Sequence, residues 1–200
     1  ASSAASDVYK RQMRYTGVLL LLTALCFVSC TGKKDFKDGI VQLQSRPVSL
    51  SLDKMRCMWN GKDTVVSEER YDTDFKLVVY SDTAACSSCG LKTMYLWDDL
   101  IHDLESYGKS VSLCFIFMPL QKDLEEFYFT MRTMAPLLPV HVDTAGIFIR
   151  ENPHIPREAV YHTFLLDKDN RVVLVGNPSR SEKIKEMFWQ IVEEKLGKRE

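Results

Sequence analysis

Residues 75–91 read FKLVVYSDTAACSSCGL, and this stretch decides the fold. Its first part, Phe75–Tyr80, is apolar except for Lys76, which is typical of a strand covered by helices on both faces. A short polar loop follows, and Cys86 and Cys89 then stand three residues apart where a helix is predicted to begin. Unpaired N–H groups and the helix dipole at that position favour a thiolate on the first cysteine. The pattern indicates a redox site at a strand-to-helix junction.

Apolar strands and amphipathic helices alternate after this junction. The expected elements are a helix over Gly90–Tyr107, a strand over Val111–Met118, a helix around Leu124–Met131, a strand over Leu138–Val142, a short helix over Ala145–Arg150, a strand hairpin over Thr163–Asp167 and Arg171–Val175, and a final helix. Right-handed helical crossovers join parallel strands, whereas the hairpin strands are antiparallel. The sequence therefore predicts an α/β fold with a mixed central sheet and helices on both faces.

The final helix has clear boundary signals. Ser179 and Glu182 match a capping box at its start. Apolar residues from Ile184 to Leu196 share one helical face, and Gly197 is expected to end the helix.

The region before the first core strand has a different pattern. Polar and apolar residues alternate from Ile40 to Trp59, Asn60-Gly61 is a turn signal, and residues 64–66 are expected to form a short strand. We interpret residues 40–72 as a β-rich extension that precedes the main domain, residues 73–200.

The N-terminal segment predicts export. Met13 is interpreted as the true start, so residues 1–12 are a non-native leader and residues 13–29 a signal peptide. Its apolar core, Val18–Val28, is shorter than the roughly 18 residues that a membrane-spanning helix needs. The ending Phe27-Val28-Ser29-Cys30 resembles the lipobox of bacterial lipoproteins, which implies lipidation of Cys30 and a tether over residues 30–39. The alternative is an ordinary secretory signal that is cut elsewhere.

Charge and cysteine content restrict the function classes. The 26 Lys and Arg residues and 27 Asp and Glu residues are mixed along the chain, so no basic stripe suggests nucleic-acid binding. Apart from Cys26 and Cys30 near the signal, four cysteines remain, and four allow three full pairings. The spacing makes Cys86 and Cys89 neighbours, while a structural bridge between Cys57 and Cys114 is left open.

The CxxC pair at the end of the first core strand, together with the late segment TFLLDKDNRVV over residues 163–173, resembles the thioredoxin superfamily. More closely, the chain is similar to lipid-anchored thioredoxin-like proteins of the bacterial periplasm. The resemblance covers residues 75–196 and implies a thioredoxin-like three-layer sandwich. It also implies that Cys86 is the attacking thiol and Cys89 the resolving thiol, with no bound cofactor and no metal. The implied partners are client proteins with thiols or disulfides, an envelope redox partner and the membrane.

Several residues depart from the thioredoxin-like pattern. Tyr161 takes the position of the family's cis-proline, so we expect a trans peptide there and a substrate groove that involves Tyr161 and His162. Ala85 replaces the usual tryptophan, Tyr80 replaces a buried acidic or amide residue, and Met94 replaces a helix-kinking proline.

Two functions follow from these observations. The first is a membrane-anchored thiol–disulfide oxidoreductase that acts through the CSSC pair. The second is a non-catalytic thioredoxin-fold envelope lipoprotein in which the disulfide is structural. The sequence does not indicate a zinc site, because it has no second CxxC or CxxH pair that could complete a tetrahedral ligand set. Near the pair, Lys92 is interpreted as solvated and Asp82 as a turn residue.

Overall fold

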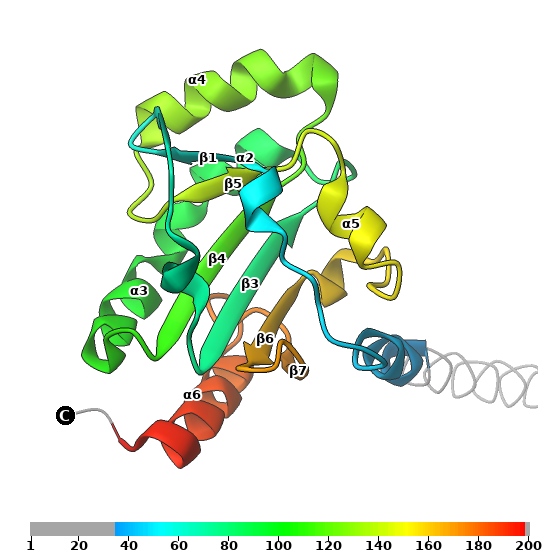
Figure 1. The fold of residues 1–200 in the computed structure, drawn as a ribbon, viewed down its shortest axis with the longest axis vertical. Helices are drawn as coiled ribbons and strands as arrows, with labels where there is room; N and C mark the ends of the chain where they lie inside the picture. The colour runs from blue at the N-terminus through cyan, green and yellow to red at the C-terminus, as the bar shows by residue number, and fades with distance from the viewer. Residues whose placement is uncertain (1–34, 199–200) are drawn as a thin grey trace, which may run out of the picture. The chain divides into compact units, whose positions relative to one another are not determined.

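The computed structural model describes residues 35–198 (Figure 1). The predicted leader, signal peptide and lipidation site at Cys30 lie outside the described residues. Residues 35–43 are helical, although the tether was expected to continue to residue 39. Within 35–198, none of the helices combines the length and the apolar character required to cross a bilayer.

The core of residues 42–198 is one mixed sheet of seven strands, in the order β2-β1-β5-β4-β3-β6-β7. Strands β3, β4 and β5 are parallel, β6 runs antiparallel to β3, and β7 runs antiparallel to β6. The predicted mixed sheet is therefore confirmed. The strand bounds are β1 Arg56–Trp59, β2 Lys62–Thr64, β3 Phe75–Ser81, β4 Val111–Phe117, β5 Val140–Val142, β6 Thr163–Asp167 and β7 Val172–Val175.

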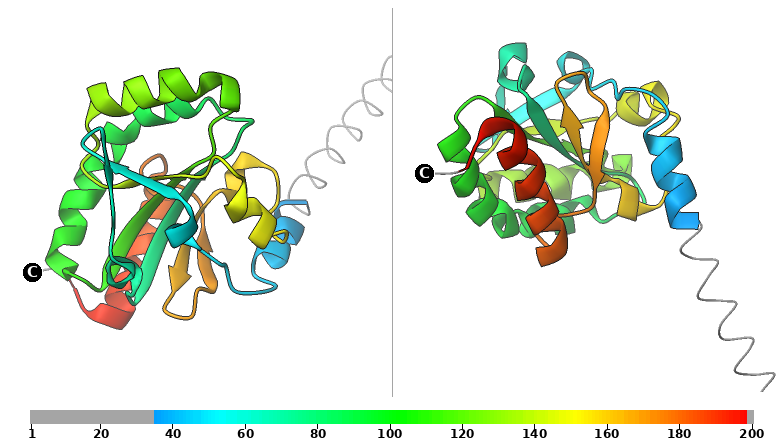
Figure 2. Two further views of the ribbon diagram at one scale, coloured as in Figure 1. Left: turned by 45° about the horizontal axis from the view of Figure 1, so that its top comes forward. Right: turned by 90° about the horizontal axis from the view of Figure 1, so that it is seen from below.

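Helices cover both faces of this sheet, as predicted. Figure 2 shows α6 on one side of the sheet and α5, with the segments that carry η1 and η2, on the other. The face toward α3, α4 and α6 holds the main apolar core. The helix bounds are η1 Leu52–Lys54, η2 Glu68–Tyr71, α2 Ser87–Lys92, η3 Met94–Trp97, α3 Asp98–Leu104, η4 Glu105–Tyr107, η5 Gln121–Asp123, α4 Leu124–Met134, α5 Ile147–Glu151, η6 Ala159–Tyr161 and α6 Glu182–Leu196.

The single helix predicted over residues 90–107 is wrong, because the structure divides it into α2, η3, α3 and η4. The first break lies at Thr93, whose backbone N–H and side-chain hydroxyl both donate to the carbonyl oxygen of Gly90, at 3.1 and 3.0 Å. This local bonding ends the α-helical turn without a proline. Met94 then turns into the core, where it is buried.

The start of α6 also differs from the prediction. Its N-cap is Ser181, whose hydroxyl accepts a hydrogen bond from the N–H of Ile184 at 3.4 Å. The hydroxyl of Ser179 instead donates to Asn177, so Ser179 belongs to the preceding turn. The predicted end at Gly197 is confirmed, and its φ of 90° suits glycine.

Residues 56–64 are part of the main sheet. The predicted turn at Asn60-Gly61 is confirmed, and both residues have positive φ, which fits a tight hairpin between β1 and β2. The second strand of this hairpin is Lys62–Thr64, whereas the sequence predicts a strand over residues 64–66. Val65 lies beyond the strand and is exposed. Strand β1 pairs with β5, which attaches the hairpin to the sheet edge. Cys57 of β1 and Cys114 of β4 are both free and buried, so the bridge between them is absent.

A buried histidine on β5 predicts a pH-dependent stability. The ring of His141 lies 2.8 Å from the hydroxyl of Tyr71, and burial, followed by the charge of Arg70, lowers its pKa from 6.5 to about 4. The unfolded chain therefore binds this proton at a higher pH than the folded protein does. As the pH falls from 6.5 toward 4, the free energy of unfolding should decrease by about 3 kcal/mol through this residue.

Chemical denaturation between pH 7 and pH 4 tests this expectation. His141→Gln should flatten the pH dependence, whereas the matched change His102→Gln, at an exposed side chain, should leave it intact. Equal pH dependence in the unmodified protein and in His141→Gln would contradict the assignment.

Candidate functional site

The site begins where β3 ends. Residues 82–85 form a turn in which one carboxylate oxygen of Asp82 accepts hydrogen bonds from the N–H groups of Ala84 and Ala85, at 3.0 and 3.2 Å. Asp82 is thus a turn residue, as predicted. The turn holds the chain between β3 and α2 and places Cys86 at the first position before the helix.

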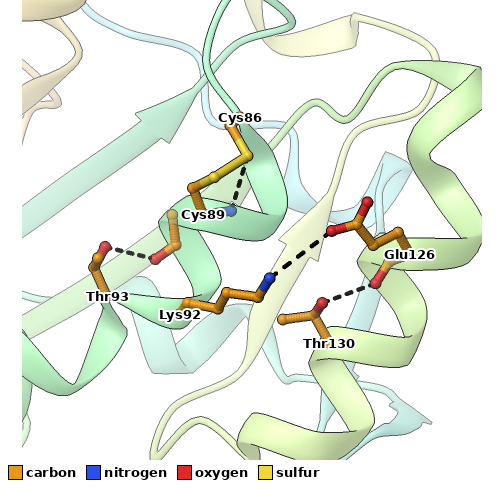
Figure 3. The surroundings of a disulfide bond; sticks show 7 residues. Cys86, Cys89, Lys92, Thr93, Glu126 and Thr130 are labelled. Atoms are coloured by element: carbon orange, nitrogen blue, oxygen red, sulfur yellow. Dashed lines mark hydrogen bonds and ion pairs between the residues drawn. A yellow bond between two sulfur atoms is a disulfide. The ribbon is translucent and has the colours of Figure 1, made fainter.

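Cys86 and Cys89 form a disulfide with their Cα atoms 5.1 Å apart (Figure 3). Cys86 is the N-cap of α2, and its Sγ atom accepts a hydrogen bond from the N–H of Cys89 at 3.2 Å. Both cysteines are exposed. A protein in solution can therefore reach the disulfide without unfolding of this domain.

Tight packing beneath α2 fixes the disulfide in place. A Cβ atom on Gly90 would lie 2.9 Å from a ring carbon of Phe117, so only glycine permits this approach of α2 to β4. Leu91 is fully buried, and Ser87 and Ser88 are also buried. One face of the short helix is thus held against the sheet, while the two sulfur atoms stay on the surface.

Charge near the disulfide is sparse and solvated. Lys92 lies 3.9 Å from the carboxylate of Glu126 on α4, and both side chains are more than half exposed, at 57 and 65% (Figure 3). An exposed pair of this kind contributes little to stability. This geometry agrees with the interpretation of Lys92 as a solvated residue, and Glu126 is a partner that the sequence did not reveal.

The two predicted groove residues lie at the same end of the sheet as the disulfide loop. His162 follows η6, its carbonyl accepts the N–H of Tyr80 at 2.8 Å, and its ring lies 3.0 Å from the carbonyl oxygen of Pro156. The expected trans peptide at Tyr161 is found, since no peptide bond in the described part of the chain is cis. Tyr161 and His162 are both buried, so their role in a substrate groove stays a prediction.

Tyr80 places a phenol where the thioredoxin-like pattern has a buried acid or amide, and the buried carboxylate of Asp143 acts on this phenol electrostatically. Its ring packs against Phe148 and His162, with centroids 4.8 and 5.1 Å away, and its hydroxyl donates to the sulfur of Met118. Burial raises the pKa of Tyr80 above its usual value of 10. The phenol is therefore protonated at neutral pH and cannot accept a proton from a cysteine.

Potential metal ligands do not gather within residues 35–198. No three His, Cys, Asp or Glu side chains of that range are grouped so as to hold a metal ion. The reactive groups that the site presents are the two sulfur atoms and the N–H group that contacts one of them.

No protein-family model and no curated protein matches the sequence. Solved structures do match, and one is a thioredoxin-like protein in its oxidised form, with 14% identity, coverage of 74% of this chain and 96% of that chain, and a TM-score of 0.48. A second is a protein from Bacteroides thetaiotaomicron proposed to be a disulfide isomerase, with 12% identity, coverage of 76% of this chain and 94% of that chain, and a TM-score of 0.45. A third is the thioredoxin domain of a thiol-disulfide oxidoreductase from Bacteroides vulgatus, with 12% identity, coverage of 70% of this chain and 99% of that chain, and a TM-score of 0.40.

The topology carries the fold assignment independently of these partial superpositions. A parallel strand leads into a helix that begins at a CxxC disulfide, and an antiparallel hairpin flanks that strand on its other side. This strand and helix order is the one that underlies the resemblance to the thioredoxin superfamily, and so the fold is thioredoxin-like.

Proposed function

We propose that this protein is a thiol–disulfide oxidoreductase that exchanges the Cys86–Cys89 disulfide with thiols and disulfides of client proteins. The observation that carries this proposal is the exposed disulfide at the start of α2, with one sulfur bonded to a backbone N–H. A purely apolar pocket would favour the uncharged thiol, whereas an N–H donor favours the thiolate that attacks a disulfide.

The exchange proceeds in two balanced steps. With the pair reduced, the Cys86 thiolate attacks one sulfur of a client disulfide, which forms a mixed disulfide and releases the other client sulfur as a thiolate. The Cys89 thiolate then attacks the Sγ atom of Cys86, which restores the internal disulfide and releases the second client sulfur. The client gains two electrons and the pair loses two. The reverse sequence oxidises a client dithiol.

The assignment of roles rests on the hydrogen bond to one sulfur. The N–H of Cys89 points at Cys86, so Cys86 is the better site for negative charge and the nucleophile. Cys89 lies within disulfide distance and is the resolving thiol. No backbone movement is needed to close the bond.

We further propose that the protein works outside the cytoplasm, anchored to a bacterial membrane by a lipid on Cys30 and facing the periplasm. The signal-like segment and lipobox at residues 13–30 support this location. An oxidising compartment also suits a disulfide in a small exported domain.

Trapping of mixed disulfides tests the function. Cys89→Ala should accumulate covalent complexes with clients, because the resolving step is lost while Cys86 still attacks. The complexes should disappear on reduction and in Cys86→Ala. They should sediment with membranes in the full chain and remain soluble in Cys30→Ala. A free, alkylatable Cys86 in Cys89→Ala without captured clients would refute the exchange reaction.

The second candidate is a binding or scaffold lipoprotein whose disulfide only staples the loop. The buried phenol of Tyr80 favours this candidate, because it is protonated at neutral pH and cannot accept the proton of a thiol. A redox titration separates the two. A structural staple should have a potential below about −300 mV, whereas working pairs lie between about −270 and −120 mV.

A further inference from the structure

Residues 44–50, which we call the strap, cross the edge of the sheet at β7 before the chain enters η1. The side-chain amide of Gln44 donates to the carbonyl oxygen of Val172 on β7 at 3.0 Å. The N–H of Val48 donates to the carbonyl oxygen of Asn170 at 2.8 Å. Val48 is the one buried residue of the strap. The strap thus depends on a few hydrogen bonds and one apolar anchor, which is typical of a segment that opens locally.

The two residues at the end of α5 hold the strap near its middle. The buried side chain of Asn152 accepts the N–H of Ser49 at 2.8 Å and donates to the carbonyl oxygen of Ser49 at 2.7 Å. The carboxylate of Glu151 accepts the hydroxyl of Ser49 at 3.1 Å and the ammonium group of Lys54 at 2.7 Å. Hydrogen bonds from Lys54 and Ser51 lower the pKa of Glu151 to about 2. This carboxylate therefore keeps its charge at neutral and mildly acidic pH.

His154 is buried beside the strap without a hydrogen-bond partner. Its side chain is only 5% exposed, and neither Nδ1 nor Nε2 has a partner within residues 35–198. Its own segment is firmly held, because Ile155 and Pro156 are buried and the N–H of Ile155 donates to Asn152 at 3.0 Å. Protonation in place would put a positive charge and a second N–H donor where no acceptor is bonded to the ring, which is costly.

The charged group that acts on this ring belongs to the strap. Burial, followed by the charge of Arg46, lowers the pKa of His154 below 6.5, whereas the backbone of Arg46 favours the protonated ring and opposes part of this shift. In the segment of His154 itself, Glu151 is engaged in its ion pair, and Arg157 and Glu158 are exposed. The ring therefore binds a proton more readily once the strap has moved away and water reaches it.

We propose that the strap is an acid-released latch, in which protonation of His154 opens residues 44–50 while the sheet stays folded. In the open state the ring is solvated and has an ordinary pKa near 6.5, whereas in the closed state its pKa is lower. The open state thus binds more protons below pH 6.5. The ratio of open to closed molecules should rise by up to about tenfold between pH 7.5 and pH 5.5.

Opening would change both the sheet edge and the reach of the chain. It would free the carbonyl oxygens of Val172 and Asn170 at the edge of the sheet from their bonds to the strap. It would also release seven residues, which span about 23 Å when extended. With the lipid anchor proposed above, the disulfide would reach farther from the membrane in acid. The opening itself does not depend on that anchor or on the exchange reaction.

Amide hydrogen exchange of the full chain measures the opening. After correction for the intrinsic pH dependence of exchange, the opening constant at the N–H of Ser49 should rise about tenfold from pH 7.5 to pH 5.5. It should exceed the constant at Phe115 on β4 at both pH values, because central strands exchange only when the sheet unfolds. A constant opening at Ser49, or equal opening constants at Ser49 and Phe115, would overturn the proposal.

Three variants identify the titrating group. His154→Gln should make the opening at Ser49 independent of pH, whereas His102→Gln, at an exposed side chain, should retain the tenfold change. Glu151→Gln should increase the opening equally at both pH values, since this carboxylate is charged throughout the range. An unchanged pH dependence in a folded His154→Gln variant, or its loss in Glu151→Gln, would refute the latch.

A ring titration of the unmodified protein decides the question even where His154→Gln does not fold. The ¹⁵N resonances of His154 should report protonation over the same pH range in which Ser49 opens. Protonation of His154 with the strap still closed would contradict the proposal.

Discussion

Replacing Cys86 with serine is expected to abolish protein-disulfide exchange, because a serine hydroxyl stays protonated at neutral pH and cannot open a disulfide. Cys86 is exposed, and its Sγ atom accepts the N–H of Cys89 at 3.2 Å, which stabilises negative charge on that sulfur once the disulfide is open. The rate at which the protein catalyses reduction of a client disulfide by dithiothreitol should fall to the uncatalysed rate.

Two further variants make this result specific. Cys89→Ser should still form a mixed disulfide with the client but, in the absence of an added thiol such as dithiothreitol, should not release it, so a single attack replaces turnover. Cys114→Ala removes a free thiol that is fully buried in β4, and it should leave the exchange rate unchanged. Normal turnover in Cys86→Ser, or loss of turnover in Cys114→Ala, would contradict the assigned chemistry.

The strands and the position of the disulfide could be predicted because their signals are local. The run Phe75–Tyr80 is apolar except for Lys76 and is found as β3, extended by one residue to Ser81. The hairpin turn at residues 168–170 is polar, and Thr163–Asp167 forms a strand with the predicted bounds. The CxxC spacing alone brings its two sulfurs within bonding distance.

The errors arise where two local signals compete or where distant segments meet. Ser179 and Ser181 both suit an N-cap, but Asn177 takes the hydroxyl of Ser179, so the helix begins after Ser181. The apolar residues of 90–107 recur at helical spacing on both sides of Thr93. The hydroxyl of Thr93 nevertheless donates a hydrogen bond to the carbonyl oxygen of Gly90, which ends the helical turn there. A hydrophobic pattern does not record either hydrogen bond.

The burial of His162 and the position of His141 beside Cys57 had no signal in the sequence. His162 is buried because Tyr80 and Pro156 pack against it, and both contacts depend on tertiary structure. The neighbours Cys57 and His141 come together only through the pairing of β1 with β5. Register between strands that are distant in sequence cannot be read from composition or periodicity.

Truncating Phe115 to alanine is expected to lower the free energy of unfolding by about 3–5 kcal/mol. Phe115 lies on β4, a central strand of the sheet, and is fully buried. Its ring packs edge-on against Trp97 of η3, with centroids 5.6 Å apart. It also borders a small cavity of about 90 Å³, so the space left by the ring would enlarge an existing void instead of being filled by neighbours.

Phe129→Ala is the matched control, because it makes the same chemical change at a side chain that is 61% exposed on α4. Its effect should stay within about 0.5 kcal/mol, since an exposed residue loses little packing. Denaturant unfolding followed by tryptophan fluorescence measures both variants. Since Trp97 follows α2 in the chain and packs on the ring of Phe115, losing that ring should also weaken the support beneath the disulfide helix. Equal stability losses in the two variants would show that the packing of η3 on β4 does not support the fold.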